Sequence, residues 1–385
     1  MNDANTLRRG FDWPLPAACL GALAAAEDAL ARLDERIRSS PIAEGFVSRT
    51  HFQDACASLW LAGELVSLED LVLHDARMDI HAPTHALTRA QAVLRARRRI
   101  ANAAPDWALS QEGLAALRGD GETALTTRVG EGGGPGDDEA PGSPGDAGPL
   151  AGELAAIDRA LDRSTKIVAG GVGEAGLRFR RAQLVGKAGE GVAKPFRDPL
   201  IYDPDGEEGE RLEAWRQTAT EVQSDSPVLA AALLWDAWET NPPLERQAWL
   251  GPLLVSATLR RKTRAHLVCV NSALRCVRRE TRRSAEQAVR LNAFLDAIQA
   301  GAEAGMKDHD RWLLARRHLE GKLKTRRSSS KLPALVEFVL ARPIASAGMI
   351  AAALGVTPRA AQTMVAELGL REITGRGRYR AWGIL

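Results

Sequence analysis

The chain has 385 residues and a formal net charge of +2, and 45% of its residues are hydrophobic. This length can bury a substantial core and is typical of two or three domains, but no apolar run approaches the roughly 18–20 residues that cross a bilayer. The first residues also lack the basic-then-apolar order of a secretion signal, so the sequence predicts a cytoplasmic protein with no membrane partner. Ala, Leu, Arg and Glu dominate, which predicts a mainly α-helical fold.

Charge is distributed unevenly along the chain. Residues 1–257 carry 26 Lys/Arg against 39 Asp/Glu, residues 258–331 carry 19 against 7, and residues 332–385 carry 6 against 3. An acidic front and a basic back are typical of a chain whose C-terminal end faces nucleic acid. The alternative is that the arginines of the basic part form a solvated helix face, as for Arg278, Arg279, Arg282 and Arg283.

Residues 1–128 form the first predicted region, a layer of helices. Apolar residues recur there at helical spacing in four segments, 22–38, 51–61, 69–80 and 88–98. The histidines of this region, His74, His81 and His85, are separated by gaps of seven and four, which do not fit one helical face. We therefore expect polar loop and surface histidines rather than a metal site.

The four cysteines, Cys19, Cys56, Cys269 and Cys276, show neither the paired spacing of a zinc site nor the density of a disulfide scaffold. Buried thiols in a reducing compartment account for all four.

Residues 129–149 form a predicted linker. From Gly130 to Gly148 the sequence is almost entirely Gly, Pro, Asp, Glu, Ser and Ala, which have nothing to bury, so we expect this segment to be disordered. It is not a phosphate-binding loop, because no Gly-Lys-Ser/Thr closes it.

Residues 150–325 form a predicted second helical core. Pro227–Thr240 has the pattern of an apolar helix, and the segment Asn241–Leu254 follows it. That segment resembles the loop of the Fic family, His-Pro-Phe-x-Asp/Glu-Gly-Asn-Gly-Arg-x-x-Arg followed by leucines. The resemblance implies a helical fold in which the histidine is the general base, the loop and its arginines hold nucleotide phosphates, and the acid helps bind magnesium. Its products would be AMP-modified protein hydroxyls.

The segment departs from the Fic pattern at the positions that carry the chemistry. Asn241 stands at the position of the base and cannot accept a proton near neutral pH. Arg246 and Ala248 stand where glycines would let phosphate approach the backbone. The asparagine and the two arginines are replaced by Gln247, Trp249 and Pro252, whereas Pro242, Glu245 and Leu253-Leu254 are kept. We therefore expect a degenerate core with no catalytic residue, no cofactor and no enzymatic activity.

Two further motifs lie upstream. Ser40, Glu44 and Gly45 match the Ser/Thr-x-x-x-Glu-Gly motif of many Fic proteins, which implies a glutamate that competes with a nucleotide phosphate for an arginine; that arginine's position holds Trp249 here. Ordinary N-cap and turn chemistry explains the motif equally well. The segments Leu59–Val66 and Asp70–Asp79 resemble a bacterial family of uncharacterised proteins that end in a helix-turn-helix, which implies a DNA-binding type of function.

Residues 331–385 are predicted to form a helix-turn-helix module. Leu332–Leu340 is a helix that Pro343 stops, and Ala347–Leu354 is a second helix that ends at Gly355, a residue able to take the left-handed conformation. Thr357 and Pro358 are a good N-cap and first residue for a third helix that runs to Glu367 or Leu368. Two strand-like pieces, 371–374 and 378–384, form a hairpin with a basic tip.

Leu354-Gly355-Val356-Thr357 resembles the pattern of bacterial winged-helix regulators, which implies that the third helix reads DNA. Its buried side would be formed by Ala361, Val365 and Leu368. The residues predicted to contact DNA lie on the free side of this helix and in the hairpin: Thr357, Arg359, Gln362, Thr363, Arg376, Arg378 and Arg380. Arg326–Lys331 would add a basic arm.

The sequence thus predicts a mainly α protein in which a Fic-like helical core carries a C-terminal winged helix-turn-helix with a short β-hairpin. The leading hypothesis is a DNA-binding transcriptional regulator whose partner is double-stranded DNA, with a homodimer as the geometry that paired half-sites favour. The alternatives are a protein-interaction or dimerisation module with a structural winged helix, and a divergent Fic-like nucleotidyl transferase.

Overall fold

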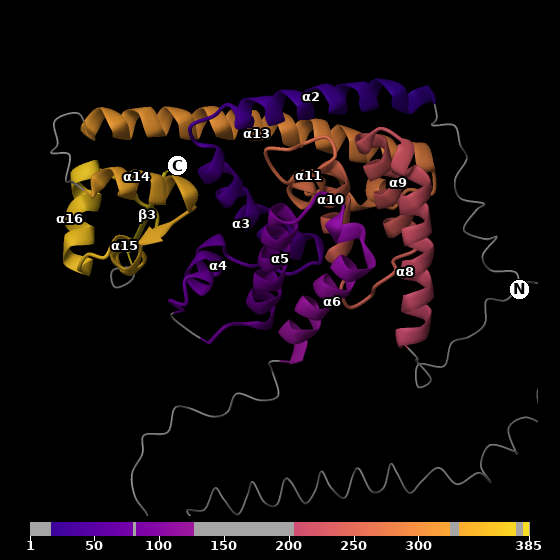
Figure 1. The fold of residues 1–385 in the computed structure, drawn as a ribbon, viewed down its shortest axis with the longest axis horizontal. Helices are drawn as coiled ribbons and strands as arrows, with labels where there is room; N and C mark the ends of the chain where they lie inside the picture. The colour runs from indigo at the N-terminus through magenta and orange to yellow at the C-terminus, as the bar shows by residue number, and fades with distance from the viewer. Residues whose placement is uncertain (1–16, 80–81, 127–203, 324–330, 375–379, 385) are drawn as a thin grey trace, which may run out of the picture. The chain divides into compact units, whose positions relative to one another are not determined.

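The computed structural model describes residues 17–79, 82–126, 204–323, 331–374 and 380–384 (Figure 1). The helices of the first stretch are α2 (Leu20–Arg38), α3 (Ala43–Leu61), α4 (Leu68–Asp75), α5 (His85–Asn102) and α6 (Gln111–Thr126), with short 3-10 turns at Ala17–Cys19 and Trp107–Leu109. All four helices predicted before residue 100 are confirmed. The largest differences are in α3, which begins at Ala43 and not at residue 51, and in α4, which ends at Asp75, shortly before Arg77 with its positive φ of 55°.

The helices after residue 203 include one of unusual length. They are α8 (Pro204–Glu221), α9 (Pro227–Thr240), α10 (Leu250–Leu259), α11 (Val270–Leu274), α12 (Arg279–Arg282) and α13 (Gln287–Leu323), with a 3-10 turn at Val222–Ser224. The predicted helix at 227–240 is confirmed with the same bounds, and the Ser226 side chain accepts the Leu229 N–H at its start. The 37-residue helix α13 was not predicted.

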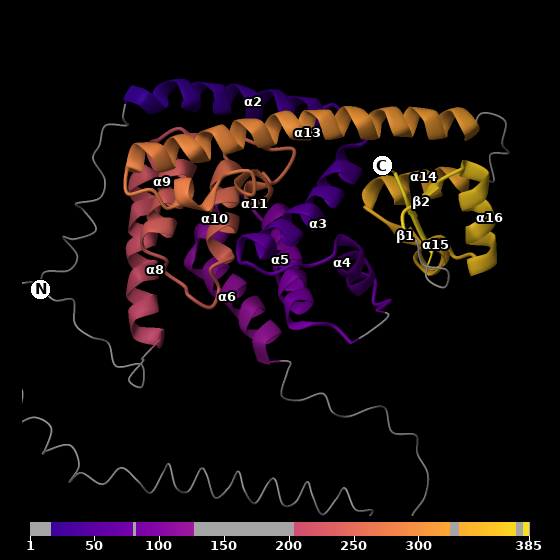
Figure 2. The same ribbon diagram turned by 180° about the vertical axis from the view of Figure 1, so that it is seen from behind.

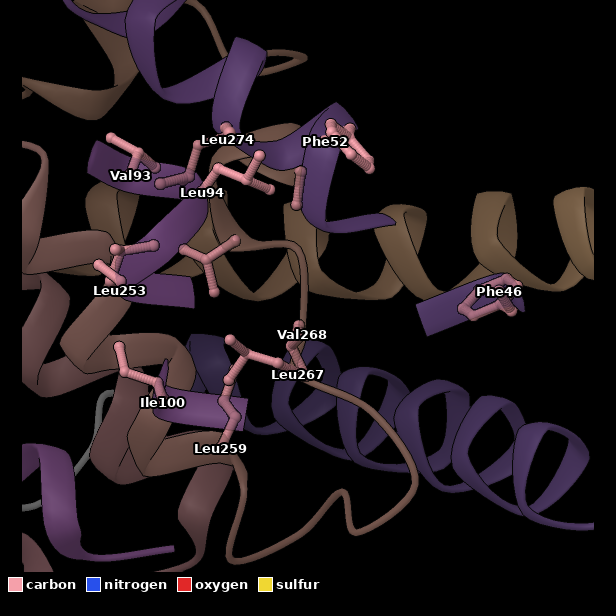
Figure 3. Close-up of a cluster of buried hydrophobic side chains, with 14 of the residues drawn as sticks. Phe46, Phe52, Val93, Leu94, Ile100, Leu253, Leu259, Leu267, Val268 and Leu274 are labelled. Carbon is pink, nitrogen blue, oxygen red and sulfur yellow. The ribbon is translucent and has the colours of Figure 1, made fainter. Parts of the chain in front are cut away.

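Helices from both sides of residues 127–203 share one hydrophobic core. Helix α2 lies along α13 over much of its length (Figures 1 and 2). Apolar side chains of α3 and α5 meet those of α10, α11 and the loop between them in the cluster shown in Figure 3, which includes Phe52, Val93, Leu94, Leu253, Leu267 and Leu274. The described residues of the regions predicted as 1–128 and 150–325 therefore contribute to the same core. The predicted linker at 129–149 lies outside the described residues.

Small residues on α13 allow neighbouring helices to approach it closely. A Cβ atom at Gly305 would lie 2.9 Å from Leu33 Cδ2 of α2, and one at Gly301 would lie 3.0 Å from Ala273 Cβ of α11. Both distances are tighter than most real Cβ contacts, so a larger residue at either glycine would make neighbouring atoms of α2 or α11 shift.

The C-terminal part contains three helices and a small antiparallel sheet. The helices are α14 (Leu332–Ala341), α15 (Ala347–Leu354) and α16 (Pro358–Leu368), and the strands β1 (Ala345–Ser346), β2 (Arg371–Glu372) and β3 (Ala381–Gly383) pair in the order β1-β3-β2. Trp382 of β3 lies opposite Ala345 on one side and Glu372 on the other. The three helices and the β2–β3 pair confirm the prediction, but β1 was missed.

The fold is therefore mainly α-helical with one short sheet, as the composition predicts. No helix in the described part of the chain is both long and apolar enough to cross a membrane.

Candidate nucleic-acid interface

The turn between α15 and α16 is built by local sequence. Gly355 ends α15 in the left-handed conformation, with φ 60° and ψ 48°, a geometry that costs a residue with a Cβ atom free energy. Thr357 is extended, and its hydroxyl accepts the N–H of Ala360 at 3.2 Å, while Pro358 occupies the first helical position. The start of α16 is thus fixed by its own residues.

Helix α16 has one packed face and one free face. Ala361, Val365 and Leu368 are at most 2% exposed and pack toward α15 and α14. The four predicted DNA-contacting residues at its start and on its other face are all exposed: Thr357, Arg359, Gln362 and Thr363. The Thr363 hydroxyl donates to the Arg359 carbonyl at 3.1 Å, and its oxygen can still accept a hydrogen bond from a ligand. Arg359, Gln362 and Thr363 thus lie on the exposed side of α16, and Thr357 caps its start.

The C-termini of α15 and α16 are neutralised by lysine side chains, whereas, among the described residues, the N-terminus of α16 is not paired with a charged side chain in the same way. Lys331 Nζ donates to the carbonyls of Leu354 and Gly355 at 2.7 and 3.1 Å, and Lys322 Nζ donates to the carbonyl of Leu368 at 2.6 Å. Each ammonium offsets the partial negative charge at a helix C-terminus. The N-terminus of α16 keeps its partial positive charge at an exposed surface beside Arg359, which favours a phosphate there.

The hairpin contributes less than expected within the described residues. Arg376 and Arg378 lie outside them. Arg380 is exposed but forms an ion pair with Glu372, with 2.7 Å between Nη2 and Oε2, and its guanidinium lies 5.4 Å from the centre of the Trp382 ring. Arg380 is thus already engaged in the free protein, and a phosphate would have to replace Glu372. The exchange is inexpensive, since exposed ion pairs contribute about 0–1 kcal/mol.

A buried arginine of α3 joins the helical core to this C-terminal part. Arg49 is 4% exposed. Its Nη1 donates to the Val339 carbonyl at 3.1 Å, and its Nη2 donates to the carbonyls of Ile384 and Pro343 at 3.0 and 3.4 Å. Burial lowers the pKa of Arg49 to about 10, so it stays charged at neutral pH. No sequence pattern indicates this role, because Arg49 has the spacing of an ordinary helix residue.

The aromatic ring beneath Arg49 belongs to α13. The guanidinium lies 4.8 Å from the centre of the Trp312 ring, a cation–π distance. Helix α13 also contacts α14 directly, through the ion pair of Arg316 and Glu337 at 2.8 Å. The helix-turn-helix is therefore held to α3 and α13 by buried as well as exposed polar contacts.

The Ser40-Glu44-Gly45 motif lies near this same junction. The Ser40 hydroxyl is 2.7 Å from His309 Nε2 of α13, and a Cβ atom at Gly45 would lie 3.1 Å from the Leu340 carbonyl oxygen of α14. Glu44 is exposed. Ser40 and Gly45 thus serve packing between α3, α13 and α14.

The segment that resembles the Fic loop is filled by its own side chains. Gln247 is 6% exposed, and its Nε2 donates to the Arg118 carbonyl at 3.0 Å. Trp249 is also buried. Glu245 lies at the surface, 3.5 Å from an Arg211 nitrogen. The buried amide and indole occupy the positions from which phosphate-binding groups would act.

The histidines and cysteines form no metal site in the part of the chain that is described. His74 pairs with Asp79 at 2.9 Å, His85 is exposed, and His81 lies outside the described residues. Of the four thiols expected to be buried, Cys19 is buried, Cys56 and Cys269 are partly buried, and Cys276 is exposed, so the expectation was wrong for Cys276. Burial raises the pKa of Cys56 and of Cys269 to about 12, so both remain thiols.

Two parts of the chain match known protein families. Residues 332–385 match the family described as "HTH DNA binding domain", so the chain is a protein with a C-terminal helix-turn-helix DNA-binding domain. Residues 200–324 match the family described as "Protein of unknown function (DUF1612)". The chain is 47% identical over 369 residues to the "Uncharacterized protein y4cF" of Sinorhizobium fredii (strain NBRC 101917 / NGR234), which covers 92% of this chain and 93% of that protein. The chain belongs to the same family as y4cF, which confirms the predicted relationship to uncharacterised bacterial proteins that end in a helix-turn-helix.

Proposed function

We propose that this protein is a transcriptional regulator that recognises a specific sequence of double-stranded DNA with α16. The observation that carries the proposal is the exposed surface formed by Arg359, Gln362 and Thr363 on a helix whose other face is packed. These side chains start at a helix N-terminus, which is the end that contacts base edges when such a helix lies in the major groove.

The side chains on α16 suit base readout. An arginine can bind the O6 and N7 atoms of guanine with two hydrogen bonds, and a glutamine can bind adenine in the same manner. Thr357 at the helix start is placed for a phosphate, which would fix the register of the helix on the duplex. We propose that Arg359 and Gln362 read bases and that Thr363 supports them.

The β2–β3 hairpin is the wing in this proposal. Its strands pair beside β1, and the connection between them carries Arg376 and Arg378. Together with Arg380, these arginines would contact backbone phosphates and add affinity that depends on salt rather than on sequence.

The helical core has no nucleotidyl transferase activity in this proposal, and its kinship with the Fic family is a hypothesis. The sequence that follows α9 supports the kinship. The buried Gln247 and Trp249 argue against the reaction, since both would have to leave the interior for a nucleotide to enter. Incubation with ATP and Mg²⁺, followed by intact-mass analysis, should reveal no added AMP on the protein. Added AMP would revive the enzyme hypothesis.

The decisive experiment for DNA recognition is selection from random duplex DNA by the full-length protein, with sequencing, at two salt concentrations. The test variant is Arg359→Ala with Gln362→Ala. The matched control is Arg95→Ala, an exposed arginine of α5 outside the C-terminal domain. We expect an enriched motif with the wild type and the control that is lost with the double variant. Binding without a motif would leave a nonspecific basic protein, and no binding at either salt concentration would refute the proposal.

A second candidate function is favoured by Arg49. A helix-turn-helix held to the core by three hydrogen bonds from a buried arginine could be a structural cap on a protein-interaction module. The selection experiment separates the two, because a cap enriches no DNA. If the protein binds paired half-sites, we also expect a dimer, which light scattering coupled to size exclusion would detect with and without the selected DNA.

A further inference from the structure

A cavity of about 160 Å³ lies among α2, α3, α11 and α13. Its walls are mainly apolar and include Leu30, Leu33, Phe46, Val268 and Ile298. An apolar cavity of about 150 Å³ is large enough to hold benzene. The cavity therefore has the volume and the lining for a single aromatic ring.

The surrounding helices cannot close onto this space without clashes. Helix α13 presents Gly301, Ala302 and Gly305 to the cavity, and the neighbouring helices approach its two glycines so closely that an added Cβ atom would lie within 3.0 Å of Ala273 or Leu33. Because these contacts fix the distance between the helix axes, the small side chains leave a gap that neighbours cannot fill by moving inward. The space is thus a consequence of the backbone arrangement.

Some of the residues that line the cavity are polar, among them Gln53, Ser272 and Asp308. Ala304 of α13 lines the cavity and is exposed, so it lies where the cavity meets the surface. The Asp308 carboxylate is paired with Arg311 at 2.8 Å, so it does not demand a cationic ligand. A few polar groups in a mainly apolar cavity suit an uncharged molecule with one hydrogen-bonding substituent.

A short series of contacts connects the cavity to the helix-turn-helix. Phe46 lines the cavity, and its ring centre lies 5.4 Å from that of Trp312. The same Trp312 ring lies beneath Arg49, which holds the carbonyls of Val339, Pro343 and Ile384. A ligand that displaces the Phe46 ring would move the surface on which Arg49 rests.

We propose that this cavity binds a small uncharged molecule with one aromatic ring and one hydrogen-bonding group, and that its occupancy alters DNA affinity through Phe46, Trp312 and Arg49. The effect on DNA rests on the proposed function, whereas the binding step does not. The ligand thus regulates the orientation or stability of the domain that carries α16.

The binding step is tested with benzyl alcohol and a panel of similar one-ring neutral compounds, titrated into the full-length protein by calorimetry. Ala304→Trp places a large side chain at the mouth, and Ala31→Trp is the matched control, since Ala31 is an exposed alanine of α2 that does not line the cavity. We expect saturable binding by the wild type and the control, and binding weakened about tenfold or more in Ala304→Trp, because the ring loses apolar contact area. Circular dichroism checks that both variants are folded.

The coupling step is tested by measuring affinity for the selected DNA with and without saturating ligand. We expect a shift in the wild type that disappears in Trp312→Phe and in Arg49→Met, while both variants still bind the ligand. No saturable binding by any compound, or equal binding by Ala304→Trp, would refute the cavity site. Ligand binding without a shift in DNA affinity would refute the coupling. Absence of DNA binding in both conditions would refute the proposed function but leave the calorimetric result standing.

Discussion

Replacing Arg49 with methionine should destabilise the junction between α3 and the helix-turn-helix. The guanidinium makes three hydrogen bonds to the carbonyls of Val339, Pro343 and Ile384, at 3.0–3.4 Å. Hydrogen bonds from a charged donor contribute about 1.5–3 kcal/mol each. The guanidinium of Arg49 is buried without a carboxylate partner among the described residues, and burying such a charge costs several kcal/mol. The substitution removes this cost, which offsets part of the loss. We therefore expect a net loss of about 2–4 kcal/mol in the free energy of unfolding.

Urea unfolding of full-length Arg49→Met, followed by circular dichroism, measures this loss, and hydrogen exchange shows where it acts. Amides of α14 and β3 should lose protection more than those of α9 and α10, which lie away from Arg49. Arg95→Met is the control for loss of an arginine at an exposed helical site. A loss below about 0.5 kcal/mol, the size of an ordinary surface effect, or uniform loss of protection, would refute the assigned role of Arg49.

Three other substitutions test separate parts of the structure. Arg359→Ala should weaken specific DNA binding by about 1–3 kcal/mol and relax specificity at one base pair, as measured by competition binding. Asp54→Asn should destabilise the fold by about 3–5 kcal/mol in urea unfolding, since it leaves the fully buried Arg97 without its carboxylate partner. Burial raises the pKa of Asp34, but hydrogen bonds from His266 and backbone N–H groups outweigh it and lower the pKa to about 2. Because this folded-state pKa lies below the ordinary aspartate value of 3.8, the stability that Asp34 contributes is present above about pH 4 and is lost as pH falls toward 2. Asp34→Asn should flatten that part of the curve of unfolding free energy against pH, and an unchanged slope would contradict the assignment.

The C-terminal domain could be predicted closely because its signals are local. Gly355, Thr357 and Pro358 act on the backbone within a few residues of themselves, and each is found in the predicted conformation. The burial of Ala361 and Val365 follows from helical spacing alone. Strand β1 escaped prediction because two residues carry no periodicity, and they become a strand only by pairing with Trp382 and Ala381.

The helical core could be predicted less well because its defining contacts are long-range. Helix α13 packs along α2, which lies more than 250 residues earlier in the chain. No pattern in the sequence of either helix indicates that the other helix is its packing partner. Its Gly301 and Gly305 weaken the helical signal, yet they are needed where neighbouring helices approach. Arg49 likewise has no local signature, since its partners are carbonyls that any sequence could supply.

The buried contacts of Arg49 also constrain how the protein can use its DNA-binding domain. If the helix-turn-helix hung on a flexible tether, α16 would reach DNA in many orientations, and events in the core would not affect it. With Arg49 bound to the carbonyls after α14 and after β3, the orientation of α16 depends on the positions of α3 and α13. The same two helices line the cavity. In the proposed function, the helical core can thus affect DNA recognition by setting the position of α16.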